Sequence, residues 1–140
     1  MSSTISEKVI VITGASTGIG AAAARQLSAK GASLVLVARR EEALRDVAAG
    51  VESRAHPIAA DVGNRAEVRR VVDGAIARFG RIDVWVNNVG RGISRLPSML
   101  NDEDIDEMIA VNVKTALYGM EIRAQSFERR ASSRASALSA

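Results

Sequence analysis

The sequence predicts an α/β fold in which a parallel sheet of about four strands carries helices on its faces. Four short apolar runs are separated by three longer segments with helical patterns. Glycine or asparagine marks most of the junctions between them. The runs are largely apolar throughout, without alternating polar residues, which is typical of parallel strands that are buried on both faces.

The expected elements follow in a regular order. The strands are bounded by turn residues and cover residues 8–13, 33–38, 55–60 and 82–87. Two helices cover residues 18–29 and 41–49, and a third begins after its cap Asn64 and runs to Phe79. Alternation at this spacing predicts right-handed crossovers between neighbouring parallel strands.

A further helix is expected after a loop that contains Pro97. It covers residues 102–120, with acidic side chains in the first turn that suit the helix dipole. Its apolar residues lie on one side of the helix. If no other element covers that side, we expect it to be an exposed hydrophobic patch that promotes association. From residue 121 onward alanine, serine and arginine dominate, and no fifth strand pattern follows. We therefore expect residues 121–140 to be a disordered tail.

Composition excludes several classes of function. The chain has 140 residues, enough for one domain, and no cysteine, so thiolate metal sites are excluded. The net charge is +3, but only 3% of residues are aromatic and the basic residues are dispersed, which argues against nucleic-acid binding. No run is long enough to span a membrane, and a single histidine predicts no metal site. We expect a cytoplasmic protein.

A glycine-rich segment joins the first strand to the first helix. In such a turn the glycines let the backbone approach an anion, and the helix N-terminus attracts phosphate. Within a strand–helix–strand unit this predicts a Rossmann-type site for the pyrophosphate of a dinucleotide, although an isolated motif of this kind is often a mere tight turn. The residues expected to hold the cofactor here are Gly14, Ser16, Thr17, Gly18, Ile19 and Gly20.

The end of the second strand indicates which dinucleotide is bound. NAD-binding sites of this type place a carboxylate there for the ribose 2′-hydroxyl. This chain has Ala38, followed by Arg39 and Arg40. Guanidinium groups suit a 2′-phosphate, so NADP(H) is favoured over NAD(H). The alternative is that both arginines are surface residues at the start of a helix.

Four segments in order resemble the motifs of the short-chain dehydrogenase/reductase family. They are the segment 14–20, Asp61-Val62, Asn87-Asn88-Val89-Gly90 and Val111-Asn112-Val113. The resemblance covers residues 7–120, so we divide the chain into a dinucleotide-binding half-domain (1–120) and a tail outside the family pattern (121–140). It implies an oxidoreductase that transfers hydride between NADP(H) and a small carbonyl or alcohol substrate.

The resemblance also implies roles for individual residues. Asp61 and Val62 would contact the adenine, and Asn88, Val89 and Gly90 would line the cofactor where the fourth strand ends. Val89 departs from the alanine that is usual in the family. Asn112 resembles the active-site asparagine that supports a proton-relay water, and its neighbours Val111 and Val113 favour a buried environment.

The family's remaining catalytic residues do not occur in the sequence. The family uses a tyrosine, a lysine four residues later, and a serine on a fifth strand. The single tyrosine, Tyr118, is followed four positions later by Ile122, so we read it as part of a helix surface. We expect a catalytically incomplete product, truncated by a reading-frame change near codon 121. The alternative is a nucleotide-binding or interaction protein without catalysis. The apolar side of the last helix is a possible homo-oligomer contact.

Overall fold

The computed structural model describes residues 4–51, 54–92, 94 and 96–122, and a four-stranded parallel sheet forms its centre. The strands are β1 (Val9–Thr13), β2 (Ser33–Ala38), β3 (Ala55–Ala59) and β4 (Val84–Val86). They are arranged in the order β3-β2-β1-β4, with β1 paired to both β2 and β4. The predicted Rossmann-type fold class is confirmed.

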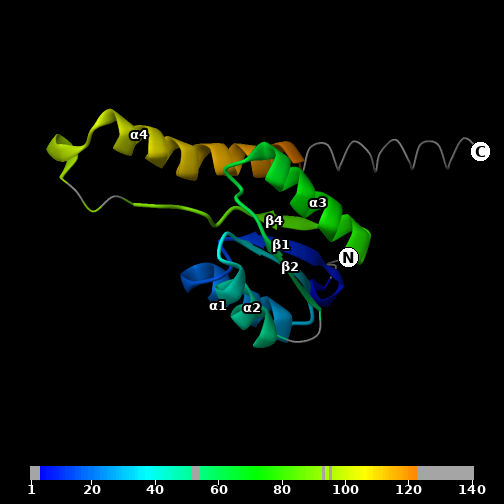
Figure 1. Ribbon diagram of the computed structural model, residues 1–140. Coiled ribbons are helices and arrows are strands. Elements are labelled where there is room, and N and C mark those ends of the chain that lie inside the picture. Colours follow the sequence, from blue (N-terminus) through cyan, green and yellow to red (C-terminus); the bar gives the residue numbers. More distant parts are fainter. Residues whose placement is uncertain (1–3, 52–53, 93, 95, 123–140) are drawn as a thin grey trace, which may run out of the picture.

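Helices cover both faces of this sheet (Figure 1). Helices α1 (Gly18–Ala29) and α2 (Glu41–Ala49) lie on one face, and α3 (Arg65–Phe79) lies on the other. Each face therefore has its own apolar core. The first core contains Ile12, Leu36 and Leu44, and the second contains Val11, Val35 and Val71, all fully buried.

The signals that begin and end α3 act as the sequence predicts. The Asn64 side chain accepts hydrogen bonds from the backbone N–H groups of Ala66 and Glu67. Gly80 ends the helix with a φ of 78°, a left-handed conformation that favours glycine. Packing against β1, β2 and β3 through Val68 and Val71 supplies the rest of its stabilisation.

The last helical segment differs from the regular helix predicted over residues 102–120. Helix α4 covers Asp102–Ile109, a π-helical turn follows over Ala110–Lys114, and α-helix resumes from 115 to 122. The Asn112 side chain donates to the carbonyl oxygen of Met108 one turn earlier, 3.0 Å away. A side chain that bonds within the helix in this way accounts for the irregular turn, because it competes with the regular backbone bonds.

The residues at the start of the predicted tail lie in this helix. Glu121 forms an ion pair with Arg65 at 3.0 Å, and Ile122 packs against the second core. Tyr118, expected on the helix surface, is half-buried against the same core, with the Arg65 guanidinium over its ring at 4.9 Å. Residues 123–140 lie outside the described residues, so the predicted disorder of the tail stays a prediction.

Candidate functional site

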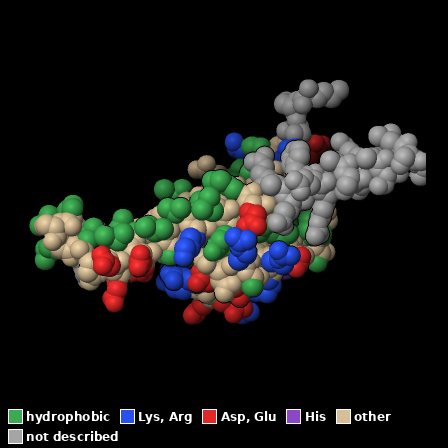
Figure 2. Space-filling view, turned by 90° about the horizontal axis from the view of Figure 1, so that it is seen from above, with side chains coloured by type: hydrophobic (Ala, Val, Ile, Leu, Met, Phe, Trp, Pro, Cys, Tyr) green, Lys and Arg blue, Asp and Glu red, His purple; other side chains and the backbone are tan. Residues whose placement is uncertain are grey.

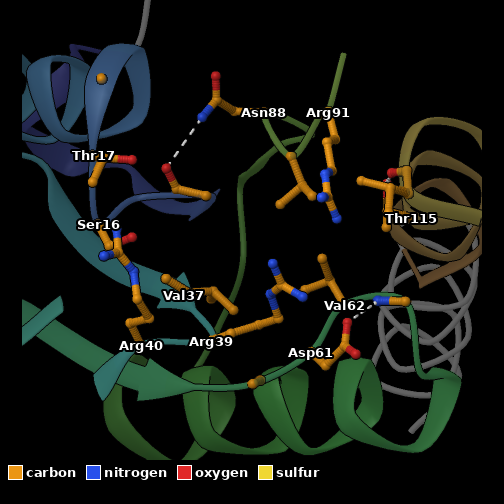
Figure 3. A pocket seen from close by; sticks show the side chains of 18 of the residues that line it. Ser16, Thr17, Val37, Arg39, Arg40, Asp61, Val62, Asn88, Arg91 and Thr115 are labelled. Carbon is orange, nitrogen blue, oxygen red and sulfur yellow. Dashed lines mark hydrogen bonds between the residues drawn. The ribbon is translucent and has the colours of Figure 1, made fainter. Parts of the chain in front are cut away.

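A cavity of about 820 Å³ lies at the carboxyl ends of the four strands. Its walls come from the turns that follow β1, β2, β3 and β4 and from the helical segment around residues 110–115 (Figure 3). This is where open parallel sheets bind ligands, beside the point at which the strand order reverses. The lining residues are Gly14, Ser16, Thr17, Gly18, Ile19, Val37, Ala38, Arg39, Arg40, Ala60, Asp61, Val62, Gly63, Asn88, Val89, Gly90, Arg91, Ala110, Val111 and Thr115.

The glycine loop has the geometry of an anion cradle. Gly18 has a φ of +55°, and a Cβ added there would meet nothing within 4 Å, so the backbone borders open space. Gly20 does not line the cavity, and its requirement for glycine is steric: a Cβ there would lie 2.2 Å from the Gly14 carbonyl oxygen. The side chain of the cap residue Thr17 forms no capping hydrogen bond. The first-turn N–H groups of α1 are therefore available to an anion.

Three partly buried hydrogen bonds fix this loop against the end of β4. The Thr13 hydroxyl donates to the Val86 carbonyl oxygen at 3.0 Å and accepts from the Asn88 backbone N–H at 3.0 Å. The Asn88 amide Nδ2 also donates to the Gly14 carbonyl oxygen at 3.3 Å (Figure 3). Asn88 therefore joins the turns after β1 and β4 into one wall. Val89 completes this wall, 3.4 Å from the position of a Cβ added at Gly14.

Two arginines follow β2 and enter the cavity. Arg39 and Arg40 are exposed, whereas Val37 and Ala38 before them are buried. Figure 3 shows the Arg40 side chain extending towards Ser16 and the Arg39 side chain extending towards Val62. Within the described ranges neither guanidinium is paired with an acidic side chain. Their positive charge is therefore available to a ligand.

The turn after β3 presents one carboxylate. Asp61 is exposed, and its Oδ1 accepts from the Gly63 backbone N–H at 2.9 Å. Its backbone N–H donates to Glu67 Oε2 at 3.0 Å, which anchors the turn to the start of α3. A carboxylate in this state has further acceptor capacity. Val62 is buried beside it and supplies an apolar surface to the cavity.

Asn112 is exposed and does not line the cavity, contrary to the buried environment expected from its neighbours. Its Oδ1 accepts from the Arg91 backbone N–H at 3.0 Å, and its Nδ2 donates to the Arg91 carbonyl oxygen at 2.9 Å. The π-turn carries it to the helix surface that faces the loop after β4. Its visible role is to hold that loop against α4.

Arg91 is a charged pocket residue that sequence reasoning missed. It is the third guanidinium in a lining whose one acidic residue is Asp61. Its side chain is ion-paired with Glu107 of α4. A single arginine after a glycine belongs to no recognised sequence motif, so no signal in the sequence indicated that Arg91 would line the cavity. Sequence reasoning also did not place Ala110, Val111 and Thr115 in the lining, because their position depends on how α4 packs.

Among the residues that the structure describes, no group of three histidine or acidic side chains could hold a metal ion. None of the helices placed there is long and apolar enough to cross a bilayer.

Comparisons with known proteins identify the family of this chain. The family model for short chain dehydrogenase matches residues 8–135, so the match continues past the boundary predicted at residue 120. An uncharacterised oxidoreductase of Staphylococcus epidermidis is 40% identical over 117 residues, which cover 84% of this chain and 51% of that protein.

Solved structures resemble the fold closely. A 3-ketoacyl-(acyl-carrier-protein) reductase from Brucella melitensis, complexed with NADH, has a TM-score of 0.87 and 29% identity, and covers 93% of this chain and 54% of its own. A short-chain type dehydrogenase/reductase from Mycobacterium marinum has a TM-score of 0.82 and 32% identity, covering 88% and 50%. This chain thus spans about half the length of these relatives. The chain belongs to the short-chain dehydrogenase family.

Proposed function

We propose that this chain binds NADP(H) in the cavity at the carboxyl ends of its strands, as the cofactor half of an oxidoreductase for small carbonyl or alcohol substrates. The observation that carries the proposal is that three kinds of binding group line the same cavity. A glycine loop offers helix N–H groups, an apolar and acidic turn lies opposite, and two arginines stand at the end of β2 without an acidic partner among the described residues.

Each part of the dinucleotide has a matching wall. The pyrophosphate would lie on the loop from Gly14 to Gly20, with Ser16, Thr17 and Ile19 beside it. The adenine would lie between Val62 and the Asp61 carboxylate, which accepts a hydrogen bond from an amino group. The loop that contains Asn88, Val89 and Gly90 would cover the ribose and the reactive half. The bound cofactor supplies the hydride.

The preference for NADP(H) rests on Arg39 and Arg40. A 2′-phosphate placed at the end of β2 would meet these guanidinium groups, and no carboxylate there repels it. The Brucella melitensis relative is complexed with NADH, so both dinucleotides must be compared directly. Charge-assisted bonds to phosphate are worth about 1.5–3 kcal/mol, or about tenfold to a hundredfold in affinity.

Fluorescence titration of the full chain with NADPH and NADH tests this preference. We expect NADPH to bind at least about tenfold more tightly. Arg39→Gln and Arg40→Gln should each reduce that difference while leaving NADH affinity nearly unchanged. Arg25→Gln, on the exposed side of α1, serves as the control. Equal affinities for the two dinucleotides would contradict the role of the arginines, and no binding of either would contradict the proposed function.

We propose further that the chain alone transfers no hydride. The printed sequence contains no tyrosine followed four positions later by lysine, and the lysines are Lys8, Lys30 and Lys114. A cofactor-binding protein without catalysis is the function that this observation favours as a second candidate. NADPH oxidation by the purified chain with any carbonyl compound would refute the proposal.

A cytoplasmic location and a homo-oligomer also stay predictions. Five apolar side chains along the last helical segment are between 43% and 59% exposed, and Figure 2 shows a row of hydrophobic side chains along the projecting helix. We propose that a second copy of this chain covers them, because a stripe of about 22 Å is long enough for two helices to pack in a symmetric pair. The stripe consists of Ile105, Ile109, Val113, Leu117 and Met120.

Sedimentation of the full chain tests the pairing. Leu117→Lys places a charge in the stripe and should shift the protein to a monomer. Asp106→Lys makes the same kind of change at an exposed acidic position of α4 and should leave the pair intact. A wild-type chain that sediments as a monomer at high concentration would refute the pairing. Fractionation of cells that produce the chain tests its location.

A further inference from the structure

Arg91 is anchored at the cavity by its own backbone. Its N–H and its carbonyl oxygen both bond to the Asn112 side chain, at 3.0 and 2.9 Å. The side chain lines the cavity, and Figure 3 shows it entering from the wall opposite the glycine loop. Its guanidinium also meets Glu107, one and a half turns before Asn112 on the helical segment.

The position of Arg91 separates it from the two arginines after β2. In the strand order β3-β2-β1-β4, β2 and β4 flank β1 on opposite sides. Neighbouring strands lie about 4.8 Å apart, so the ends of β2 and β4 are separated by about 10 Å. Arg39 and Arg40 therefore stand on the side where the ribose 2′ position is read, and Arg91 starts on the other side of the glycine loop.

We propose that Arg91 is a further cofactor-binding residue, which holds the pyrophosphate linker of the dinucleotide from the wall opposite the glycine loop. This inference rests on the proposed dinucleotide function. A guanidinium binds phosphate oxygens through two parallel N–H groups, and the loop supplies N–H groups to the other side of the same linker. The linker is common to NADP(H) and NAD(H), so Arg91 acts on both.

Glu107 is a positioning residue for this arginine. The ion pair is exposed, with the Arg91 side chain 57% and the Glu107 side chain 46% accessible, so it holds the guanidinium only weakly. Glu107 does not line the cavity. In the free protein Glu107 keeps the Arg91 guanidinium turned partly towards α4. A bound phosphate would compete with Glu107 for this guanidinium. Removing its charge should therefore strengthen cofactor binding, the opposite of the effect expected for Arg91.

Titrations of the full chain with NADPH and with NADH test both roles. Arg91→Gln should raise the dissociation constants for both dinucleotides about fivefold to tenfold, with the two changes within about twofold of each other. Arg91→Lys, which keeps the charge without the planar fork, should fall between wild type and Arg91→Gln. Glu107→Gln should lower both constants about twofold or more. The control is Arg45→Gln, which breaks the comparable exposed pair with Glu41 outside the cavity and should change neither constant.

Each outcome distinguishes the proposed dinucleotide binding from the role of Arg91 within it. A wild-type chain that binds neither dinucleotide refutes the proposed function and the role of Arg91 with it. Normal wild-type binding with unchanged constants in Arg91→Gln refutes the role of Arg91 alone. A loss confined to NADPH places Arg91 at the 2′-phosphate and overturns the assignment to the linker. Thermal unfolding of each variant shows whether it is folded, and Glu107→Gln gives a change of opposite sign that misfolding would not produce.

Discussion

Replacing Gly20 by alanine should separate cofactor binding from folding. The added Cβ would lie 2.2 Å from the Gly14 carbonyl oxygen and 2.9 Å from its carbonyl carbon, both backbone atoms. An ordinary contact between carbon and oxygen is about 1.3 Å longer than the distance to the carbonyl oxygen, because van der Waals contacts lie near 3.5 Å. The glycine loop and the start of α1 must therefore move apart by about that much.

The two effects of this substitution have different magnitudes. Overpacking costs about 1–3 kcal/mol, and alanine regains about 1 kcal/mol of helix propensity at this position in α1. The net loss of stability should be about 0–2 kcal/mol, a fall of at most about 10 °C in Tm for a domain of this size. A site displaced by more than about 0.5 Å no longer fits its ligand, so NADPH affinity should fall at least about thirtyfold.

Thermal unfolding by circular dichroism and NADPH fluorescence titration measure the two effects. Gly18→Ala is the matched control, because its Cβ meets nothing within 4 Å and only the φ of +55° opposes it, at about 1–2 kcal/mol. We expect Gly18→Ala to destabilise the fold with a smaller loss of affinity than Gly20→Ala. Wild-type NADPH affinity in Gly20→Ala would show that the loop adapts to the added atom and would refute the reasoning.

Three further substitutions test the supports of the site. Thr13→Val leaves the partly buried Asn88 N–H without its acceptor on the buried Thr13 side chain and should cost about 1–3 kcal/mol in urea unfolding; an unchanged midpoint would contradict this. Asn112→Ala frees the loop at Arg91, so proteolysis should cut that loop faster while Tm falls only by the equivalent of about 1–2 kcal/mol, and unchanged cleavage would argue against the anchor. Leu44→Ala should cost about 2–5 kcal/mol through a core cavity without selectively weakening either dinucleotide; a change in selectivity would refute that separation.

The strands and the first three helices could be predicted because their signals are local. β1 and β2 are continuous apolar runs, and in the structure each of their residues is buried. The helix bounds follow from residues that act within one turn, such as Asn64 and Gly80. Since both signals depend on neighbours in sequence, no knowledge of the packing was needed to place these elements.

The last helical segment shows where this reasoning ends. Its apolar spacing predicts a regular helix, but the Asn112 side chain bonds to residues in a loop twenty-one positions earlier and to its own helix. No local pattern reports such a contact, and the flanking valines wrongly favoured burial. The same limit hid Arg91, whose place in the cavity depends on the order of the strands. The glycine loop could be predicted because the backbone conformations and close contacts that it needs require glycine, and glycine is visible in the sequence.

The parallel arrangement of the strands makes the two ends of the sheet unequal. Every turn that follows a strand borders the cavity, and the turns that precede the strands, such as those at Gly31 and Gly80, lie at the far end. A peptide inserted into a turn of the second kind disturbs no cavity wall. The turns at that far end are therefore suitable places for a reporter or a tether, because an attachment there leaves the cavity open to solution.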